Sequence, residues 1–243
     1  MCRGGSMMQN EKKDNILMLL RKLQTDRTLE KAEFVELIKN RELIEDELFQ
    51  ISKEIHVENF HRKVYVRGLI EISSYCGNDC YYCGIRRSNR NAKRYRLNAE
   101  EIYEQVRFGT KLGFKSFVLQ GGEDPGFSDK TLIEVIKEIK RINPQTAITL
   151  SVGEKPFETL KAYKEAGADR FLLRHETRDK EHYYKLHPSD MDQDFRLHML
   201  EDLKKLGFQT GSGIMIGSPY QTEENLAEDL LFLRKLNPEM IGI

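Results

Sequence analysis

Three cysteines stand close together in one short segment, Cys76-Gly-Asn-Asp-Cys80-Tyr-Tyr-Cys83. Three thiolates in one loop can bind three irons of a cubane [4Fe–4S] cluster, which needs four ligands in all. The only other cysteine, Cys2, lies far away near the start of the chain. The fourth iron would therefore lack a protein ligand, and an open coordination site is where a small molecule can bind and react. The spacing predicts a cluster that does chemistry rather than one that only carries electrons.

Two other interpretations of the same cysteines have to be weighed. A structural zinc ion needs four ligands, and only a distant residue such as His61 could supply the fourth. Three buried structural cysteines are less favoured still, because Gly, Asn, Asp and Tyr between them are typical of a loop rather than a core strand. A cysteine-cluster module that binds a partner without catalysis stays open as a hypothesis from another class.

Polar residues suited to ligand binding recur after several short apolar runs. Such residues are costly in a core and useful at the end of a strand. Paired glycines let the backbone approach a ligand closely, and a neighbouring carboxylate can accept a hydrogen bond from an ammonium group. The segments are Gln120-Gly-Gly-Glu-Asp124, Thr149-Leu-Ser151-Val-Gly-Glu154, Arg174-His-Glu-Thr177 and Gly211-Ser-Gly-Ile-Met-Ile-Gly217. None contains the GK[ST] sequence of a phosphate-binding P-loop, which argues against nucleotide hydrolysis.

A run of cations follows the last cysteine, from Arg86 to Arg96. Such a run is commonly a solvated loop. Its place beside the cysteines also allows it to shield the iron or to dock an acidic partner, and both readings stay open.

The bulk composition excludes several classes of protein. Lys and Arg together number 39, as do Asp and Glu, so no overall field favours nucleic acid or an anionic membrane. The longest apolar run of the first helix, residues 16–20, is far shorter than the roughly 20 residues of a membrane span. Clustered cysteines that are not dispersed in pairs indicate a reducing compartment. We therefore expect a cytoplasmic protein with no nucleic acid or membrane partner.

Alternation of strands and helices organises the chain beyond the cysteines. Apolar strand patterns are expected at 64–72, 116–120, 147–151, 170–173, 211–216 and 240–243, with helices between them at 98–112, 129–142, 156–166, 194–206 and 222–236. This order predicts a parallel sheet covered by helices. An open doubly wound sheet fits the pattern, but polar motifs after each strand favour a TIM-type (βα) barrel, whose sites form at the carboxyl ends of its strands.

Three regions are expected along the chain. Residues 1–9 are predicted to be a disordered leader, 10–60 a helical extension, and 61–243 the barrel core. With about six strands the barrel is predicted to be incomplete, as in a fragment whose C-terminal part, with any second cluster, is missing.

The cysteine segment resembles the signature of the radical S-adenosylmethionine (SAM) superfamily, C-x3-C-x2-C with an aromatic residue before the last cysteine. The resemblance implies that Cys76, Cys80 and Cys83 bind a [4Fe–4S] cluster whose open iron binds SAM. Reduction of the cluster would then yield a 5′-deoxyadenosyl radical that abstracts hydrogen from a small-molecule substrate. Gly121-Gly122-Glu123 resembles the segment that contacts the SAM amino group, Tyr82 holds the aromatic position near the adenine, and Met215 lies in the glycine-rich segment that borders it.

A narrower resemblance rests on several segments read in order: Cys83-Gly-Ile-Arg-Arg, Arg94-Tyr-Arg, Leu119-Gln-Gly-Gly-Glu-Asp-Pro125, Leu172-Leu-Arg-His-Glu-Thr177 and Gly217-x-Pro-x-Gln-Thr222. Together they resemble the [FeFe]-hydrogenase maturases of the HydE type, in the biotin-synthase-like branch. This family implies SAM contacts at Ser151, Glu176 and Arg196, and a substrate cavity faced by Thr149 and Arg174. It also implies a reductant such as ferredoxin or flavodoxin and, as a partner, a scaffold maturase. Methylornithine synthase, from the same branch, is the alternative enzyme.

Overall fold

The computed structural model describes residues 4–243, so Cys2 and the first part of the expected leader lie outside the described residues. The chain divides into two compact units. We call Val66–Tyr220 with Leu236–Ile243 the barrel unit, and the residues up to Tyr65 with Gln221–Lys235 the helical unit. Each unit is described by itself.

The barrel unit is built on one sheet of six parallel strands in sequential order. The strands are β1 (Gly68–Ser73), β2 (Ser116–Gly121), β3 (Ala147–Ser151), β4 (Arg170–Leu172), β5 (Gln209–Gly213) and β6 (Met240–Gly242). Each strand pairs with the next one along the chain. A doubly wound sheet reverses its strand order at a switch point, and this sheet does not. The α/β prediction and its barrel-type arrangement are therefore confirmed, with six strands present.

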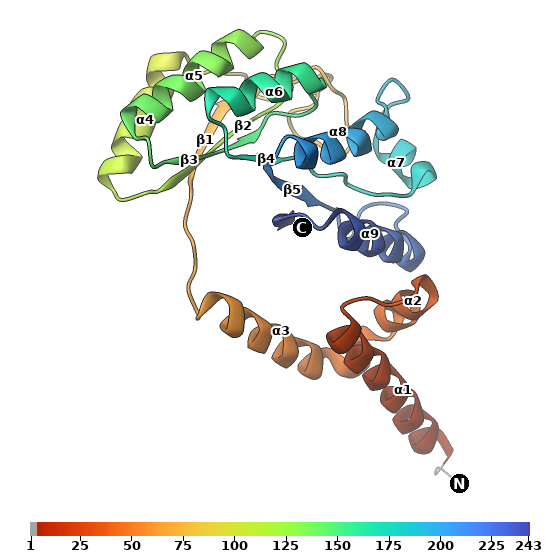
Figure 1. Cartoon of the computed structure of the whole chain (residues 1–243). Helices are drawn as coiled ribbons and strands as arrows, with labels where there is room; N and C mark the ends of the chain where they lie inside the picture. Colours follow the sequence, from red (N-terminus) through yellow and green to blue (C-terminus); the bar gives the residue numbers. More distant parts are fainter. Residues whose placement is uncertain (1–3) are drawn as a thin grey trace. The chain divides into compact units, whose positions relative to one another are not determined.

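Helices of the barrel unit connect these strands and cover one face of the sheet (Figure 1). They are α4 (Ala99–Lys111), α5 (Asp129–Ile142), α6 (Phe157–Ala166), α7 (Lys180–Leu186) and α8 (Gln193–Lys205). Helix α4 begins with the capping box expected at Asn98, whose side chain accepts from the Glu101 amide while Glu101 reaches back to the Asn98 amide. The sequence did not predict helix α7, because the helix is too short to show a helical period.

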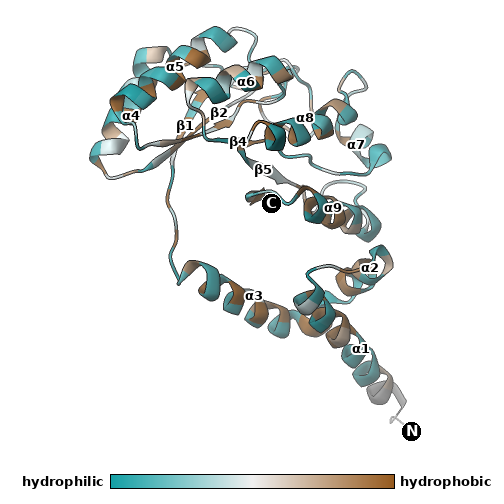
Figure 2. Ribbon diagram, viewed as in Figure 1, coloured by the Kyte–Doolittle hydropathy of each residue, from teal (hydrophilic) through white to brown (hydrophobic). Residues whose placement is uncertain are grey.

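The core of the barrel unit lies between the helices and the sheet. Buried apolar side chains of α5, such as Val135, Ile136 and Ile139, belong to this core, as do Leu119 and Leu150 of the sheet. Burial of each such side chain contributes roughly 1.5–3 kcal/mol relative to exposure. Figure 2 shows the matching pattern, with hydrophilic residues along the outward faces of these helices.

The first strand is shorter than its apolar pattern predicts. A strand was expected over 64–72, but β1 spans Gly68–Ser73, and Val64, Tyr65 and Val66 are exposed. The register with β2 shifts between Glu71 and Ser73, a bulge at the carboxyl end of β1. Bulges re-aim a strand next to functional sites, and here the chain leaves β1 directly into the cysteine segment.

The helical unit contains α1 (Gly4–Asp26), α2 (Lys31–Lys39), the 3-10 helix η1 (Arg41–Ile44), α3 (Glu45–Phe60) and α9 (Glu223–Leu236). Ile16 and Leu20 of α1 share a core with Phe34 and Leu37 of α2 and with Ala227 of α9. Lys39 of α2 also forms an ion pair with Glu224 of α9 at 3.1 Å. Within residues 4–243, no helix has both the length and the apolar character needed to cross a bilayer.

Candidate active site

The cysteine loop, residues 74–98, leaves the carboxyl end of β1 and contains almost no regular structure. Its three cysteines are half-buried and have free thiols. Backbone bonds shape the turn, since the Cys83 amide donates to the Cys80 carbonyl at 3.0 Å and the Arg87 amide donates to the Asn78 carbonyl at 2.8 Å. The Asn78 amide lies 3.4 Å from the Cys76 sulfur, so a peptide N–H points at a predicted ligand.

Burial makes two of these thiols reluctant to ionise while they are free. It raises the pKa of Cys80 to about 11, although the positive charge of Arg196 acts in the opposite direction. Burial likewise raises the pKa of Cys76. Only thiolates bind metal, so a soft, positively charged group that replaces these protons is the natural partner of the loop.

A single metal ion and a cluster make different demands on the cysteines. Among residues 4–243, no three His, Cys, Asp or Glu side chains converge closely enough to hold one metal ion. A tetrahedral zinc ion needs its sulfurs gathered about 2.3 Å from one centre. A cubane cluster instead spreads its ligands over separate irons, one thiolate to each. Three cysteines are the number of thiolates that a cubane cluster with one open iron would take from the protein.

The Gly121-Gly122-Glu123 segment lies directly against the cysteine loop. The Gly77 amide donates to the Glu123 carbonyl at 2.8 Å. A Cβ atom on Gly122 would stand 2.3 Å from the Tyr75 carbonyl oxygen and 2.7 Å from Cβ of Cys76, so no side chain fits there. The approach is less close at Gly121, where a Cβ atom would lie 3.2 Å from Cγ1 of Ile72 and 3.2 Å from the Ser73 carbonyl oxygen. The adjacent glycines thus let the backbone after β2 pass beside the first cysteine.

Glu123 connects this segment to the end of β3. Its Oε1 accepts a hydrogen bond from the Glu154 amide at 2.9 Å. Gly153 has φ +78°, and a Cβ atom there would lie 1.9 Å from Cγ of Glu123. Glycine meets both conditions, which explains its place in the Val-Gly-Glu segment that follows β3.

Charged side chains continue the chain of contacts across the carboxyl ends of β3 and β4. Arg196, from α8, forms an ion pair with Glu154 at 2.7 Å and donates to the Arg174 carbonyl at 2.9 Å. Burial raises the pKa of Glu154, against the attraction of Arg196. Arg174 in turn lies 3.2 Å from the Glu176 carboxylate. Buried charges are costly unless they are paired, so this cluster is held by mutual compensation.

Glu176 is held in an unusual backbone conformation. Its φ is +68°. Its amide donates to the carbonyl of Gly213, the last residue of β5, and its carbonyl accepts from the Met215 amide just after β5. Burial raises the pKa of its carboxyl, although Arg174 opposes that shift. A non-glycine residue with positive φ is uncommon and is often found where a site requires it. Hydrogen bonds and ion pairs thus link a series of residues across the strand ends: Glu123, Glu154, Arg196, Arg174, Glu176 and Met215.

Thr149 and Ser151, two predicted residues on β3, remain outside this series. Thr149 is buried, and its hydroxyl oxygen has no hydrogen-bond partner. An unsatisfied buried hydroxyl costs about 1–3 kcal/mol, which a bound ligand would recover. Ser151 ends β3 opposite Gln120 and is half-buried. Both lie on β3, the strand that leads to Gly153 and Glu154.

Tyr82 is held by a residue that the sequence did not single out. Its hydroxyl lies 3.0 Å from Nε2 of His187, whose ring stacks on Tyr183 with 4.0 Å between centroids. Nδ1 of His187 faces the Tyr183 carbonyl at 2.9 Å and must donate, so Nε2 accepts from Tyr82. Burial lowers the pKa of His187 to about 4, which keeps the ring neutral. His187 was missed as a site residue because it carries no spacing signal of its own, whereas Glu154 lies in one of the polar segments that the sequence pointed to.

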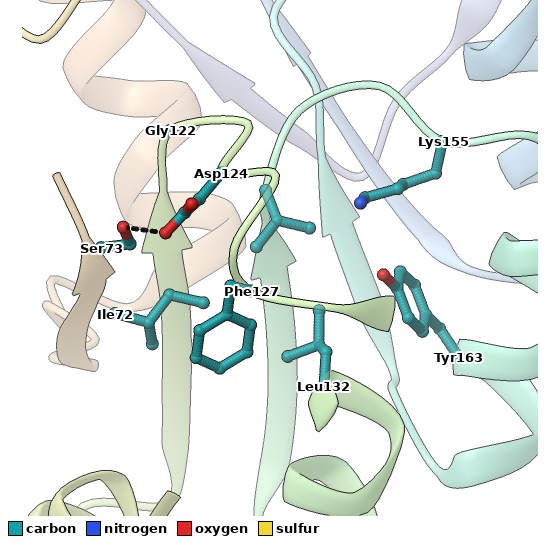
Figure 3. A pocket seen from close by; sticks show the side chains of 9 residues that line it. Ile72, Ser73, Gly122, Asp124, Phe127, Leu132, Lys155 and Tyr163 are labelled. Carbon is teal, nitrogen blue, oxygen red and sulfur yellow. Dashed lines mark hydrogen bonds between the residues drawn. The ribbon is translucent and has the colours of Figure 1, made fainter. Parts of the chain in front are cut away.

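A small cavity of about 20 Å³ lies beneath Gly122 and is lined by Ser73, Asp124, Lys155 and Tyr163, among others (Figure 3). Its volume suits one water molecule and is far too small for SAM. Ser73 donates to Asp124 at 2.5 Å, and Arg96 binds the same carboxylate with two nitrogens at 2.6 Å. These contacts support the segment after β2 from below; the cavity is not the ligand site.

Comparisons with known proteins identify the family of this chain. Residues 70–233 match the Radical SAM superfamily, so the chain belongs to that superfamily. It is 44% identical over 221 residues to the [FeFe] hydrogenase maturase subunit HydE of Thermotoga maritima, covering 88% of this chain and 63% of that protein. A crystal structure of methylornithine synthase (PylB) aligns with a TM-score of 0.76 and 25% identity, covering 94% of this chain and 62% of that one. Biotin synthase of Staphylococcus epidermidis is 24% identical over 93% of this chain and 71% of its own length.

These similarities confirm the predicted resemblance to the HydE type and to the biotin-synthase-like branch. The chain spans less than two thirds of the maturase and of the methylornithine synthase that it matches.

Proposed function

We propose that this protein binds a [4Fe–4S] cluster through Cys76, Cys80 and Cys83, binds SAM beside it, and acts in [FeFe]-hydrogenase maturation. The observation that carries this proposal is the contact between the cysteine loop and the Gly121–Glu123 segment, from which the charged series runs across the ends of β3 and β4. The identity to HydE over most of the chain supports the maturation role. When bound, the cluster supplies an electron for reductive cleavage of SAM to a 5′-deoxyadenosyl radical.

The chain's own residues would orient SAM around that cluster. The backbone at Gly122 leaves room for close approach, and the second carboxylate oxygen of Glu123 is available to an ammonium group. Arg196 is suited to a carboxylate, with Ser151 and Glu176 as further polar contacts. Tyr82 and Met215 would border the adenine.

The substrate would be a small molecule held deeper in the barrel unit. Thr149 offers its unpaired hydroxyl, and Arg174 offers a guanidinium whose Nε has no hydrogen-bond partner. A hydroxyl within β3 and a cation just after β4 suit a small polar or anionic compound. We place the protein in the cytoplasm, with a ferredoxin or flavodoxin as reductant and a scaffold maturase as recipient.

Anaerobic reconstitution with iron and sulfide, followed by dithionite reduction and EPR with and without SAM, tests the proposal. A reduced [4Fe–4S] signal that shifts when SAM is added is expected, because SAM binds the open iron. Absence of iron, or a signal indifferent to SAM, would contradict it and favour the non-catalytic cysteine-cluster module.

Methylornithine synthase is the second candidate, favoured by the alignment over 94% of this chain. Product analysis separates the two candidates. Formation of methylornithine by the reconstituted protein would identify the second, whereas SAM cleavage without that product leaves the first.

A further inference from the structure

Most cations of the run after the cysteines are exposed, yet several of its arginines form hydrogen bonds within the loop. Arg86 donates to the Cys83 carbonyl at 3.0 Å, and Arg87 donates to the Gly77 carbonyl at 3.1 Å. Arg96 is bound to Asp124. Within the described residues 86–96, Arg90 and Lys93 are the exposed cations whose side chains form no hydrogen bond or ion pair. The arginines are therefore used mainly inside the loop.

Arg94 makes the largest number of these contacts. Its Nη1 donates to the carbonyls of Ser74 and Ile85, the latter at 2.8 Å. Its Nη2 donates to the Arg86 carbonyl at 2.8 Å and to the Asn89 carbonyl at 3.2 Å. One half-buried guanidinium thus joins the beginning of the cysteine loop to the residues that follow its last cysteine.

Neighbouring contacts hold Arg94 in place at the beginning of the loop. The Ser74 hydroxyl donates to the Lys93 carbonyl at 3.0 Å and accepts from the Tyr95 amide at 2.8 Å. The Ser74 amide also donates to the Tyr95 carbonyl at 3.0 Å. Residues 93–95 therefore lie alongside Ser74, on the chain just before Cys76.

The chemistry of arginine fits this position and that of lysine does not. Backbone carbonyls in an irregular loop need donors, because no helix or sheet supplies them. A guanidinium carries five N–H donors in a fixed planar fork, whereas an ammonium is a compact point charge with three. Four carbonyls spread over the loop can be satisfied together only by the fork.

We propose that Arg94 is a positioning residue that closes the cysteine loop into its ligand-binding shape before any cluster is bound. The consequence for cluster retention rests on the proposed function, while the effect on the loop does not. Three variants separate the charge of Arg94 from its fork of donors. Arg94→Gln removes both the charge and the fork, whereas Arg94→Lys removes the fork and keeps the charge. Arg90→Gln, which removes an exposed charge from the same loop, is the matched control.

Hydrogen–deuterium exchange of the metal-free protein measures loop closure directly. We expect the amides of Arg87 and Ser88, bonded to Asn78 and Asp79, to exchange about tenfold faster in both Arg94 variants, because bonds from a charged donor are lost. The control should match the wild type. Thermal melting of each metal-free variant verifies folding, and Arg94→Lys serves if Arg94→Gln does not melt cooperatively.

Iron release from the reconstituted protein to a chelator gives the second readout, and EPR with SAM gives a spectroscopic one. We expect iron loss about tenfold faster, and a weaker SAM-dependent shift, in Arg94→Lys than in the control. Exchange and iron release that both match the control would overturn the proposal. A wild type that binds no iron, with faster exchange in the Arg94 variants, would contradict the proposed function and leave the role of Arg94 standing.

Discussion

The cysteine loop and the charged cluster at the ends of β3 and β4 hold their residues in different ways. The loop is a single stretch of chain, and its ligands are positioned by nearby backbone carbonyls and arginines. The charged cluster draws Glu154, Arg174 and Arg196 from separate segments and depends on buried ion pairing. Because the loop is one stretch of chain, it is recognisable as a sequence motif. The charged cluster of side chains forms only when the barrel unit has folded, because its residues come from separate segments.

The largest expected effect is at the loop itself. Replacing Cys80 with serine removes one of three iron ligands, so we expect reconstituted protein to lose essentially all of the SAM-responsive EPR signal. Iron and sulfide content measured beside the spectra check the loss. Cys2→Ser is the control and should load normally; a full cluster in the Cys80 variant would refute the ligand assignment.

Breaking the ion pair between Arg196 and Glu154 should have the largest effect on the stability of the fold. Arg196→Met leaves Glu154 buried without its partner, and we expect the free energy of unfolding to fall by about 3 kcal/mol in urea titrations. The double variant Glu154→Gln with Arg196→Met should recover part of that loss, because no charge is stranded. Equal stability of the single and double variants would show that the pair is not coupled.

The contact between the two regions is tested at Gly122. A methyl group there collides with Tyr75 and with Cβ of Cys76, so Gly122→Ala should destabilise the protein by about 2 kcal/mol and reduce cluster loading. Gly84→Ala lies in the cysteine loop, with nothing within 4 Å of the added atom, and is the control. Identical melting curves and iron contents for the two variants would argue against the close approach.

The smallest effect concerns the support beneath the glycines. Arg96 beside Asp124, with Ser73 and the Gly126 amide, lowers the pKa of Asp124 from 3.8 to about 2. A depressed carboxyl pKa stabilises the fold above the unfolded value and loses that contribution as pH falls toward the folded value. We expect about 1 kcal/mol of this contribution to disappear between pH 6 and pH 3.

Urea titrations at the two pH values check this expectation. Asp124→Asn should be less stable than wild type at pH 6 and should lose less stability on acidification. Exposed Asp190→Asn is the control and should follow the wild type. An unchanged pH dependence in Asp124→Asn would contradict the assignment.

Sequence patterns predicted most of the fold and only part of the site. Strand–helix alternation, the capping box at Asn98 and the polar ends of the strands were sufficient to anticipate a parallel sheet with a barrel-type arrangement. The start of β1 was predicted too early, because exposed residues such as Val64 carry the same apolar pattern as a strand. The short helix α7 was not predicted, because it is too short to show a helical period. Local patterns do not report where pairing stops.

By itself, the sequence determined the cysteine spacing, the glycine pairs and the family to which the chain belongs. Those features act over a few residues, so the order of residue types is enough to reveal them. Only the tertiary structure decided that Arg196 pairs with Glu154, that His187 holds Tyr82 and that Arg94 turns inward. Such contacts join residues brought together by the packing of the barrel unit or the closing of a loop, and an ion pair or a hydrogen bond forms only where folding has placed both partners.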